Sequence, residues 1–191
     1  MSNAQKNDAG LVAAVVYEDL SLFEYGCAVE VFSLPRPELG AGWYRFTTVA
    51  CTRGPLRGAG GIQIVADGDL KLFDEAKTII VPGWSNVATP VPEDLCQALH
   101  RASERGTRVM SICTGAFVLA AAGLLNGKKA TTHWRHAAEL ARRYPDIQVE
   151  PDVLYVDAGN ILTSAGSIAG IDLCLHLIRR DHGARIANHV A

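Results

Sequence analysis

The feature that most constrains this 191-residue sequence is a set of short apolar runs separated by segments with helical spacing. Leu11–Tyr17 is a continuous apolar run rich in β-branched residues, and Thr78–Val81 is another of the same kind. Such runs predict strands buried on both faces, because a strand with one solvated face would alternate apolar and polar residues. Further strands are expected at 45–51 and 107–112, and a hairpin or excursion at 62–66.

Between these runs, apolar residues recur at helical spacing. Pro92, Glu93 and Asp94 open a helix that ends at Gly106, since proline suits a first turn and acids favour its positive end. Helices are also expected at 24–34, 115–125, 134–144, 168–180 and from 184 onward, with two paired short strands at 153–156 and 161–164. The alternation predicts an α/β fold: an open, mostly parallel sheet with helices on both faces, in a flavodoxin-like three-layer arrangement.

Composition excludes several classes of function. The five cysteines at 27, 51, 96, 113 and 174 are scattered and include no Cys-x-x-Cys pair, so neither a disulfide framework, a metal site nor a cofactor is expected. A net charge of −2 offers no basic surface for DNA. The apolar runs are too short to cross a membrane, and residues 1–10 lack a signal peptide's apolar stretch, which predicts a cytoplasmic protein.

The strand expected at 107–112 leads directly into a helix, and Cys113 lies at the junction. Such a junction forces a strained backbone, as in a nucleophile elbow, and Gly115 and Ala116 let the helix pass close by. The thiol is also expected at a helix N-terminus, where the dipole favours thiolate. A buried structural cysteine is the alternative, but the junction favours a functional thiol.

Other polar residues fall near the same edge of the predicted sheet. His133 follows a short extended segment, where it either reaches the thiol or caps the next helix. Glu24 opens the first helix, and its position alone is explained by the favourable placement of an acid there. The turn at Gly83 and Trp84 presents amides that suit an oxyanion hole. Asp172 and His176, by contrast, share a helical face and are expected to be packing or surface residues.

These segments together resemble the ThiJ/PfpI superfamily, which is related to class I glutamine amidotransferases. The resemblance rests on the Ser-Ile-Cys-Thr-Gly-Ala turn at 111–116, the Ala-Thr-Thr-His-Trp segment at 130–134 and Val-Pro-Gly at 81–83. It implies that Cys113 and His133 are site residues and that Glu24 is the carboxylate partner of the thiol. Gly83, Trp84, Thr114 and Gly115 are then expected to contact a ligand.

Within the superfamily, 151–157, 161–166 and 170–182 resemble the amino-terminal domains of AraC-type transcription regulators. The resemblance implies a leader at 1–10, a ThiJ/PfpI-like domain at 11–183, and a helix at 184–191 leading to a helix-turn-helix region beyond this sequence. The implied function is sensing of a small-molecule effector near Cys113, with DNA bound only through that further region. No membrane partner is implied, and relatives of this kind are commonly homodimers.

Two alternatives remain open. The chain is also similar to isonitrile hydratases, which implies a cysteine-dependent hydratase or amidase-like enzyme in which Cys113 attacks and Glu24 shuttles the proton. Thr114 stands where PfpI-type peptidases have a histidine, which argues against peptidase activity. A third hypothesis is a redox sensor, with Cys113 oxidised to a sulfinate that Glu24 stabilises.

Overall fold

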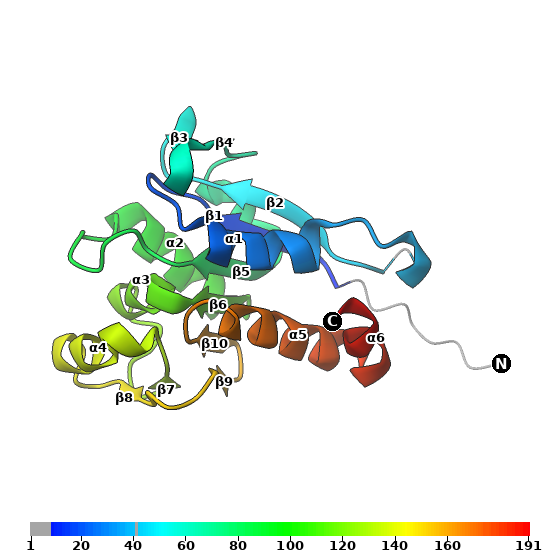
Figure 1. Ribbon diagram of the computed structural model, residues 1–191. Helices are drawn as coiled ribbons and strands as arrows, with labels where there is room; N and C mark the ends of the chain where they lie inside the picture. Colours follow the sequence, from blue (N-terminus) through cyan, green and yellow to red (C-terminus); the bar gives the residue numbers. More distant parts are fainter. Residues whose placement is uncertain (1–8, 41) are drawn as a thin grey trace.

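The computed structural model describes residues 9–40 and 42–191, which form a six-stranded sheet flanked by helices (Figure 1). The strand order is β2-β1-β5-β6-β10-β9, and every neighbouring pair is parallel except β10 and β9. Their bounds are Leu11–Val15 for β1, Arg45–Val49 for β2, Ala76–Pro82 for β5, Arg108–Ile112 for β6, Tyr155–Ala158 for β9 and Ile161–Ser164 for β10. The mostly parallel α/β sheet predicted from the sequence is confirmed.

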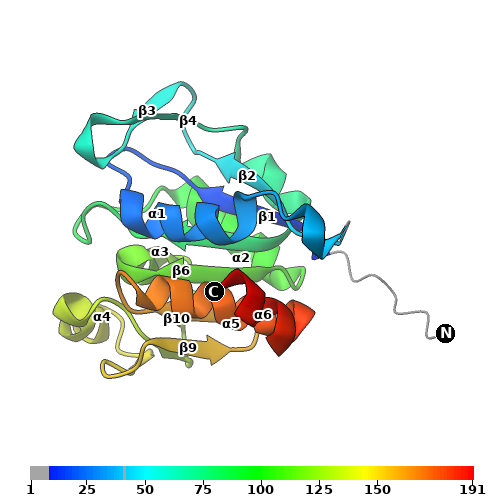
Figure 2. The same cartoon turned by 45° about the vertical axis from the view of Figure 1, so that its right-hand side comes forward.

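Helices cover both faces of the sheet (Figure 2). One face carries α1 (Leu22–Ala28), α5 (Ala169–His182) and α6 (Ala184–Val190), and the other carries α2 (Glu93–Glu104) and α3 (Ala116–Ala121). Ile80 packs in the core beneath α1 and α5, whereas its neighbours Ile79 and Val81 pack in the core beneath α2 and α3. Successive strand residues face opposite helix layers, so apolar side chains are needed at consecutive positions of the strand.

Smaller elements surround this framework. A hairpin of β3 (Pro55–Arg57) and β4 (Gln63–Val65) lies beyond β2, and β7 (Lys129–Ala130) pairs with β8 (Gln148–Val149) next to α4 (Ala137–Arg143). The helix predicted at 115–125 is shorter than expected: it opens with a 3₁₀ turn at Cys113–Gly115 and its α-helical part ends at Ala121. The left-handed Gly123 that follows, with φ +75°, ends the helix.

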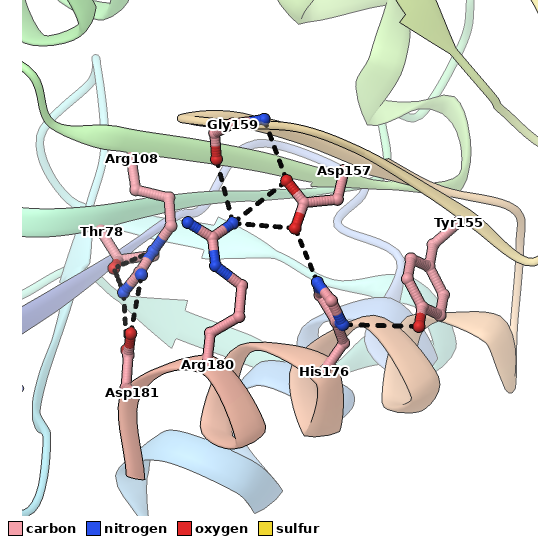
Figure 3. A network of polar contacts seen from close by, with 8 residues as sticks. All are labelled: Thr78, Arg108, Tyr155, Asp157, Gly159, His176, Arg180 and Asp181. Carbon is pink, nitrogen blue, oxygen red and sulfur yellow. Dashed lines mark hydrogen bonds and ion pairs between the residues drawn. The ribbon is translucent and has the colours of Figure 1, made fainter. Parts of the chain in front are cut away.

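One polar network joins the end of α5 to the middle of the sheet (Figure 3). The Asp181 carboxylate accepts two hydrogen bonds from the Arg108 guanidinium, at 3.0 and 2.8 Å, and one from the Tyr44 hydroxyl at 2.7 Å. Arg108 Nη2 also donates to Thr78 Oγ1 at 2.8 Å. These largely buried partners tie β5, β6 and the segment before β2 to one helical turn.

A second network holds β9, the edge strand, to α5 (Figure 3). Asp157 accepts hydrogen bonds from Arg180 at 2.9 Å and from His176 at 2.7 Å, and Arg180 also donates to the Gly159 carbonyl at 3.0 Å. Burial alone would raise the pKa of Asp157, but bonds from His176 and the Gly159 N–H, with the Arg180 charge, hold it below its usual value. His176 thus lies among surface contacts that secure an edge strand.

Among the described residues, no helix is long and apolar enough to span a membrane. Within the same part of the chain, no group of three or more His, Cys, Asp or Glu side chains is placed to hold a metal ion. The predicted leader lies mostly outside the described residues, since 1–8 are not among them.

Candidate functional site

Cys113 directly follows β6 and is the first residue of the 3₁₀ turn that precedes α3. Its φ is +58°, a left-handed conformation that costs a non-glycine residue roughly 1–3 kcal/mol. Both of its backbone groups are held: its N–H donates to the Ala165 carbonyl at 3.3 Å, and its carbonyl accepts from the Thr132 hydroxyl at 2.8 Å. The strained strand-to-helix junction predicted from the sequence is therefore confirmed.

Gly115 allows this turn to pack directly on the end of β5. A Cβ at residue 115 would lie 2.3 Å from the Val81 carbonyl oxygen and 3.2 Å from the Gly83 nitrogen. No other residue fits there without moving backbone. The close passage expected from the small residues after Cys113 is confirmed, and it assigns Gly115 a packing role.

Glu24, in the first turn of α1, lies against the Cys113 thiol. The side chain is buried, accepts a hydrogen bond from the Ser21 hydroxyl and lies close enough to the thiol to raise its pKa. Its position in the sequence alone favoured an ordinary helix N-terminal acid. The structure instead places the carboxylate beside the cysteine, as the family resemblance implies.

The surroundings of Cys113 favour the protonated thiol. Burial raises its pKa to about 11, the Glu24 charge acts in the same direction, and hydrogen bonds from Thr114 only partly oppose them. The expectation that a helix N-terminus favours thiolate here is therefore wrong. Desolvation and an adjacent carboxylate outweigh the dipole of a helix whose α-helical part spans only six residues.

His133 caps the next helix, which is one of the two roles expected of it, while contact of its ring with the thiol stays a prediction. Its Nδ1 accepts a hydrogen bond from the Arg135 N–H at 3.2 Å, which places the ring proton on Nε2. Burial, followed by the charges of His136 and Arg135, lowers its pKa and favours the neutral ring. A neutral ring in this tautomer offers a hydrogen-bond donor to a ligand.

Gly166, to which no role was assigned from the sequence, separates the imidazole from the thiol. A Cβ at this position would lie 2.4 Å from His133 Cδ2 and 3.3 Å from Cys113 Sγ. Both side chains therefore border residue 166, and the imidazole occupies space that a side chain there would need. The signal was present in the sequence, since a glycine just after β10 allows close approach at the carboxyl edge of the sheet.

The expected oxyanion hole is not formed by the amides of the β5 turn. The Gly83 N–H donates to the Ile112 carbonyl at 3.0 Å, and the Trp84 N–H donates to Thr114 Oγ1 at 2.9 Å. Thr114 Oγ1 in turn donates to the Trp84 carbonyl at 2.9 Å. These donors already hold the turn to the cysteine elbow, so the prediction of free amides at this turn is corrected.

The indole of Trp84 packs on Tyr17, with ring centroids 4.8 Å apart and an interplanar angle of 48°. Its Nε1–H donates to the Thr89 carbonyl at 3.2 Å, and the Tyr17 hydroxyl donates to the Pro82 carbonyl at 2.9 Å. Burial raises the pKa of Tyr17 well above its usual value. Tyr17 was predicted only as a strand residue, although its place after β1 is where α/β sites gather.

Two relatives and one solved structure show what this chain is similar to. It is 33% identical over 151 residues to the HTH-type transcriptional regulator CdhR of Pseudomonas aeruginosa, which covers 79% of this chain and 45% of the regulator. It is 35% identical over 138 residues to isonitrile hydratase of Pseudomonas putida, covering 71% of this chain and 59% of the hydratase. The chain thus spans about half the length of these relatives.

The solved structure is an AraC family transcriptional regulator from Pseudomonas putida, with a TM-score of 0.83 and 23% identity over 95% of this chain and 97% of that one. At that identity the likeness shows the fold alone. The family model for the DJ-1/PfpI family matches residues 11–180, which include the cysteine turn, the histidine segment and the β5 turn. The chain therefore belongs to the DJ-1/PfpI family.

Proposed function

We propose that this chain is the ligand-sensing domain of an AraC-type transcription regulator that acts in the cytoplasm as a homodimer. In this proposal a small molecule binds beside Cys113 and changes how a C-terminal region binds DNA. The observation that carries it is the match to an HTH-type regulator of which this chain covers 45%. The remainder of that regulator's length leaves room for a separate DNA-binding region.

The geometry at Cys113 supports binding. The thiol is protonated at neutral pH because its pKa is about 11, and the amides of the neighbouring β5 turn are already bonded within the protein. What the site offers a small molecule is the Glu24 carboxylate and a neutral imidazole whose Nε2 carries a proton. Such groups orient a polar ligand by hydrogen bonds without requiring a reaction.

The complete reading frame of the gene tests this proposal. We expect it to continue beyond Ala191 into a helix-turn-helix region, and the full-length protein to bind operator DNA while residues 1–191 do not. Glu24→Gln in the full-length protein is expected to keep DNA binding and to lose its response to the effector. A frame that ends at Ala191, or DNA affinity of residues 1–191 at physiological salt, would overturn the proposal.

A cysteine-dependent enzyme is the second candidate, favoured by the adjacent thiol of Cys113 and carboxylate of Glu24 and by the similarity to isonitrile hydratase. Glu24 would accept the thiol proton as Cys113 attacks an isonitrile or amide carbon. Turnover of such compounds by residues 1–191, abolished by Cys113→Ala without loss of folding, would establish this activity. Absence of turnover across an isonitrile and amide panel would exclude these substrate classes.

A further inference from the structure

A cavity of about 380 Å³ lies at the carboxyl ends of β1 and β2, next to the candidate site. Its lining is drawn from the segments after β1, β2 and β5 and from the start of α2. Cys113, Glu24 and His133 are not among the lining residues. The cavity is within the size range of small-molecule sites and lies at the sheet edge where α/β proteins bind ligands.

The inner part of this cavity is apolar and firmly held. Val16, Tyr17, Trp84 and Leu95 line it, and all four are buried. The polar atoms of the two aromatic side chains are bonded to main-chain carbonyls, those of Pro82 and Thr89, so the rings present carbon surface to the cavity. The body of a matching ligand is therefore aromatic or aliphatic.

The outer part is acidic. Glu18 and Asp19 line it and are exposed, and none of the lining residues is Lys, Arg or His. Both acids are held by contacts with Arg57 in β3: Glu18 Oε2 accepts its N–H at 3.0 Å, and the Asp19 N–H donates to its carbonyl at 2.7 Å. These contacts keep Asp19 in a left-handed conformation with φ +61°. The hydrogen bond holds the Glu18 carboxylate, whereas Asp19 is held through its main chain. Two carboxylates at the mouth of the cavity favour a cationic group and disfavour an anionic one.

We propose that this cavity binds a small primary amine, with its apolar body against Tyr17, Trp84 and Leu95 and its ammonium group next to Glu18 and Asp19. This is a second ligand site and goes beyond the proposed function, because it requires neither Cys113 nor DNA. It is linked to the cysteine elbow through Trp84, whose indole lines the cavity and whose N–H bonds Thr114.

Calorimetric titration of residues 1–191 with three probes of similar size tests the ligand class. The probes are 2-phenylethylamine, 2-phenylethanol and 3-phenylpropanoate, which differ in the charge of one end. The amine is expected to bind about tenfold more tightly than the alcohol, as two partly screened ion pairs allow, and the carboxylate to bind most weakly. Equal affinities for amine and alcohol, or no binding by any probe, would overturn the proposal.

Two variants locate the binding. Glu18→Gln with Asp19→Asn removes both charges but keeps an acceptor for Arg57 and a residue type that tolerates the left-handed conformation. This double variant is expected to bind the amine about as weakly as the alcohol, a loss of about tenfold, with alcohol binding unchanged. Ser85→Trp, at an exposed lining position, is expected to block both probes.

The control carries the same charge change at the amino ends of the strands, away from the cavity. Asp74→Asn with Glu75→Gln alters two exposed acids outside this cavity and is expected to leave the affinity for the amine unchanged. An equal loss of amine affinity in both double variants, or unaltered binding in Ser85→Trp, would refute the site. Cys113→Ala is expected to keep its affinity for the amine. Amine binding at this cavity can therefore be distinguished from binding of an effector beside Cys113.

Discussion

Backbone strain at single residues occurs beyond the carboxyl ends of the parallel strands. The three described non-glycine residues with positive φ are Asp19, Cys113 and Ser167, at +61°, +58° and +56°. They follow the carboxyl ends of β1, β6 and β10 within a few residues. Each costs free energy of folding and persists only because neighbouring bonds hold it. Cys113 lies at the candidate site and Asp19 lines the proposed amine cavity, so strain coincides with the surfaces argued to bind ligands.

Gly166→Ala tests how closely His133 and the thiol must approach. The new methyl group would overlap the imidazole, with 2.4 Å to His133 Cδ2, so the ring is expected to move away from Cys113. We expect a loss of about 1–3 kcal/mol in the free energy of unfolding, as for other overpacked sites. Urea denaturation measures the stability, and the imidazole NMR resonances report the displacement of the ring.

Gly26→Ala is the matched control. Gly26 lies inside α1, and a Cβ there would meet nothing within 4 Å. Alanine at this position is expected to stabilise the protein by about 0.5–1 kcal/mol because it reduces the conformational freedom of the unfolded chain. Unchanged imidazole resonances in Gly166→Ala would show that residue 166 does not set the position of His133.

Glu24→Gln tests why the Cys113 pKa is raised. Burial is the first cause and remains in the variant, whereas the repulsion between carboxylate and thiolate disappears. The pKa is therefore expected to fall below about 11 but to stay above the ordinary thiol value. The pH dependence of iodoacetamide alkylation at Cys113, followed by peptide mass spectrometry, measures this shift. An identical alkylation profile in both proteins would remove Glu24 as a cause.

At the scale of elements, α5 joins the edge strand and the middle of the sheet through its two polar networks. The Arg108–Asp181 pair is the more buried, with side chains 13% and 20% exposed. Asp181→Ala is expected to cost about 3 kcal/mol, because it leaves a guanidinium without its partner in a partly buried site. Chemical denaturation followed by circular dichroism measures this loss.

Asp157→Asn provides the comparison within the same helix–sheet layer. Its partners Arg180 and His176 lie nearer the surface, so the substitution is expected to cost only about 1 kcal/mol. Amide hydrogen exchange is expected to accelerate in β9 and to remain unchanged in β6. Equal losses of stability from Asp157→Asn and Asp181→Ala would contradict the difference in burial on which both expectations rest.

Element types were predictable because both faces of the sheet are covered. The continuous apolar runs identified β1 and β5, since each strand must supply apolar residues to two layers. Helix ends were less predictable. The segment after Cys113 is apolar to Leu125, yet α3 ends at Ala121, because a left-handed turn at Gly123 and a backbone bond from Leu124 to Leu119 redirect the chain.

For the whole molecule, the places of Cys113 and Glu24 in the fold were predictable, and their chemistry was less so. The junction of strand and helix located Cys113, and the family resemblance located Glu24. Neither indicated that burial would keep the thiol protonated, or that the Thr114 hydroxyl would accept a hydrogen bond from the Trp84 N–H. Such effects depend on neighbours distant in sequence: Tyr17 and Trp84 lie 67 positions apart, and only the sheet brings them together.

The buried thiols predict a loss of global stability at alkaline pH. Burial raises the pKa of Cys27, Cys51 and Cys113 to about 11 from an ordinary value of 9.0. Between these values the unfolded chain releases protons that the folded chain retains, so the free energy of unfolding falls as pH rises. Each thiol contributes up to about 1.4 kcal/mol per pH unit in that window. Well below pH 9 their contribution is constant.

Urea denaturation from about pH 8 to about pH 10.5 tests this expectation. Stability should vary little near pH 8 and then fall steeply, with buried Tyr17 and Tyr44 acting in the same direction because burial also raises their pKa values. Cys51→Ala is the informative variant, since it removes one half-buried thiol while leaving Cys27 and Cys113 in place. Above pH 9 the free energy of unfolding of this variant should fall less steeply with pH than that of the unsubstituted protein, by the contribution of one thiol. Identical slopes would show that the Cys51 thiol, which lines the proposed amine cavity, has nearly the same pKa in the folded and unfolded chains, and that its burial does not govern its ionisation.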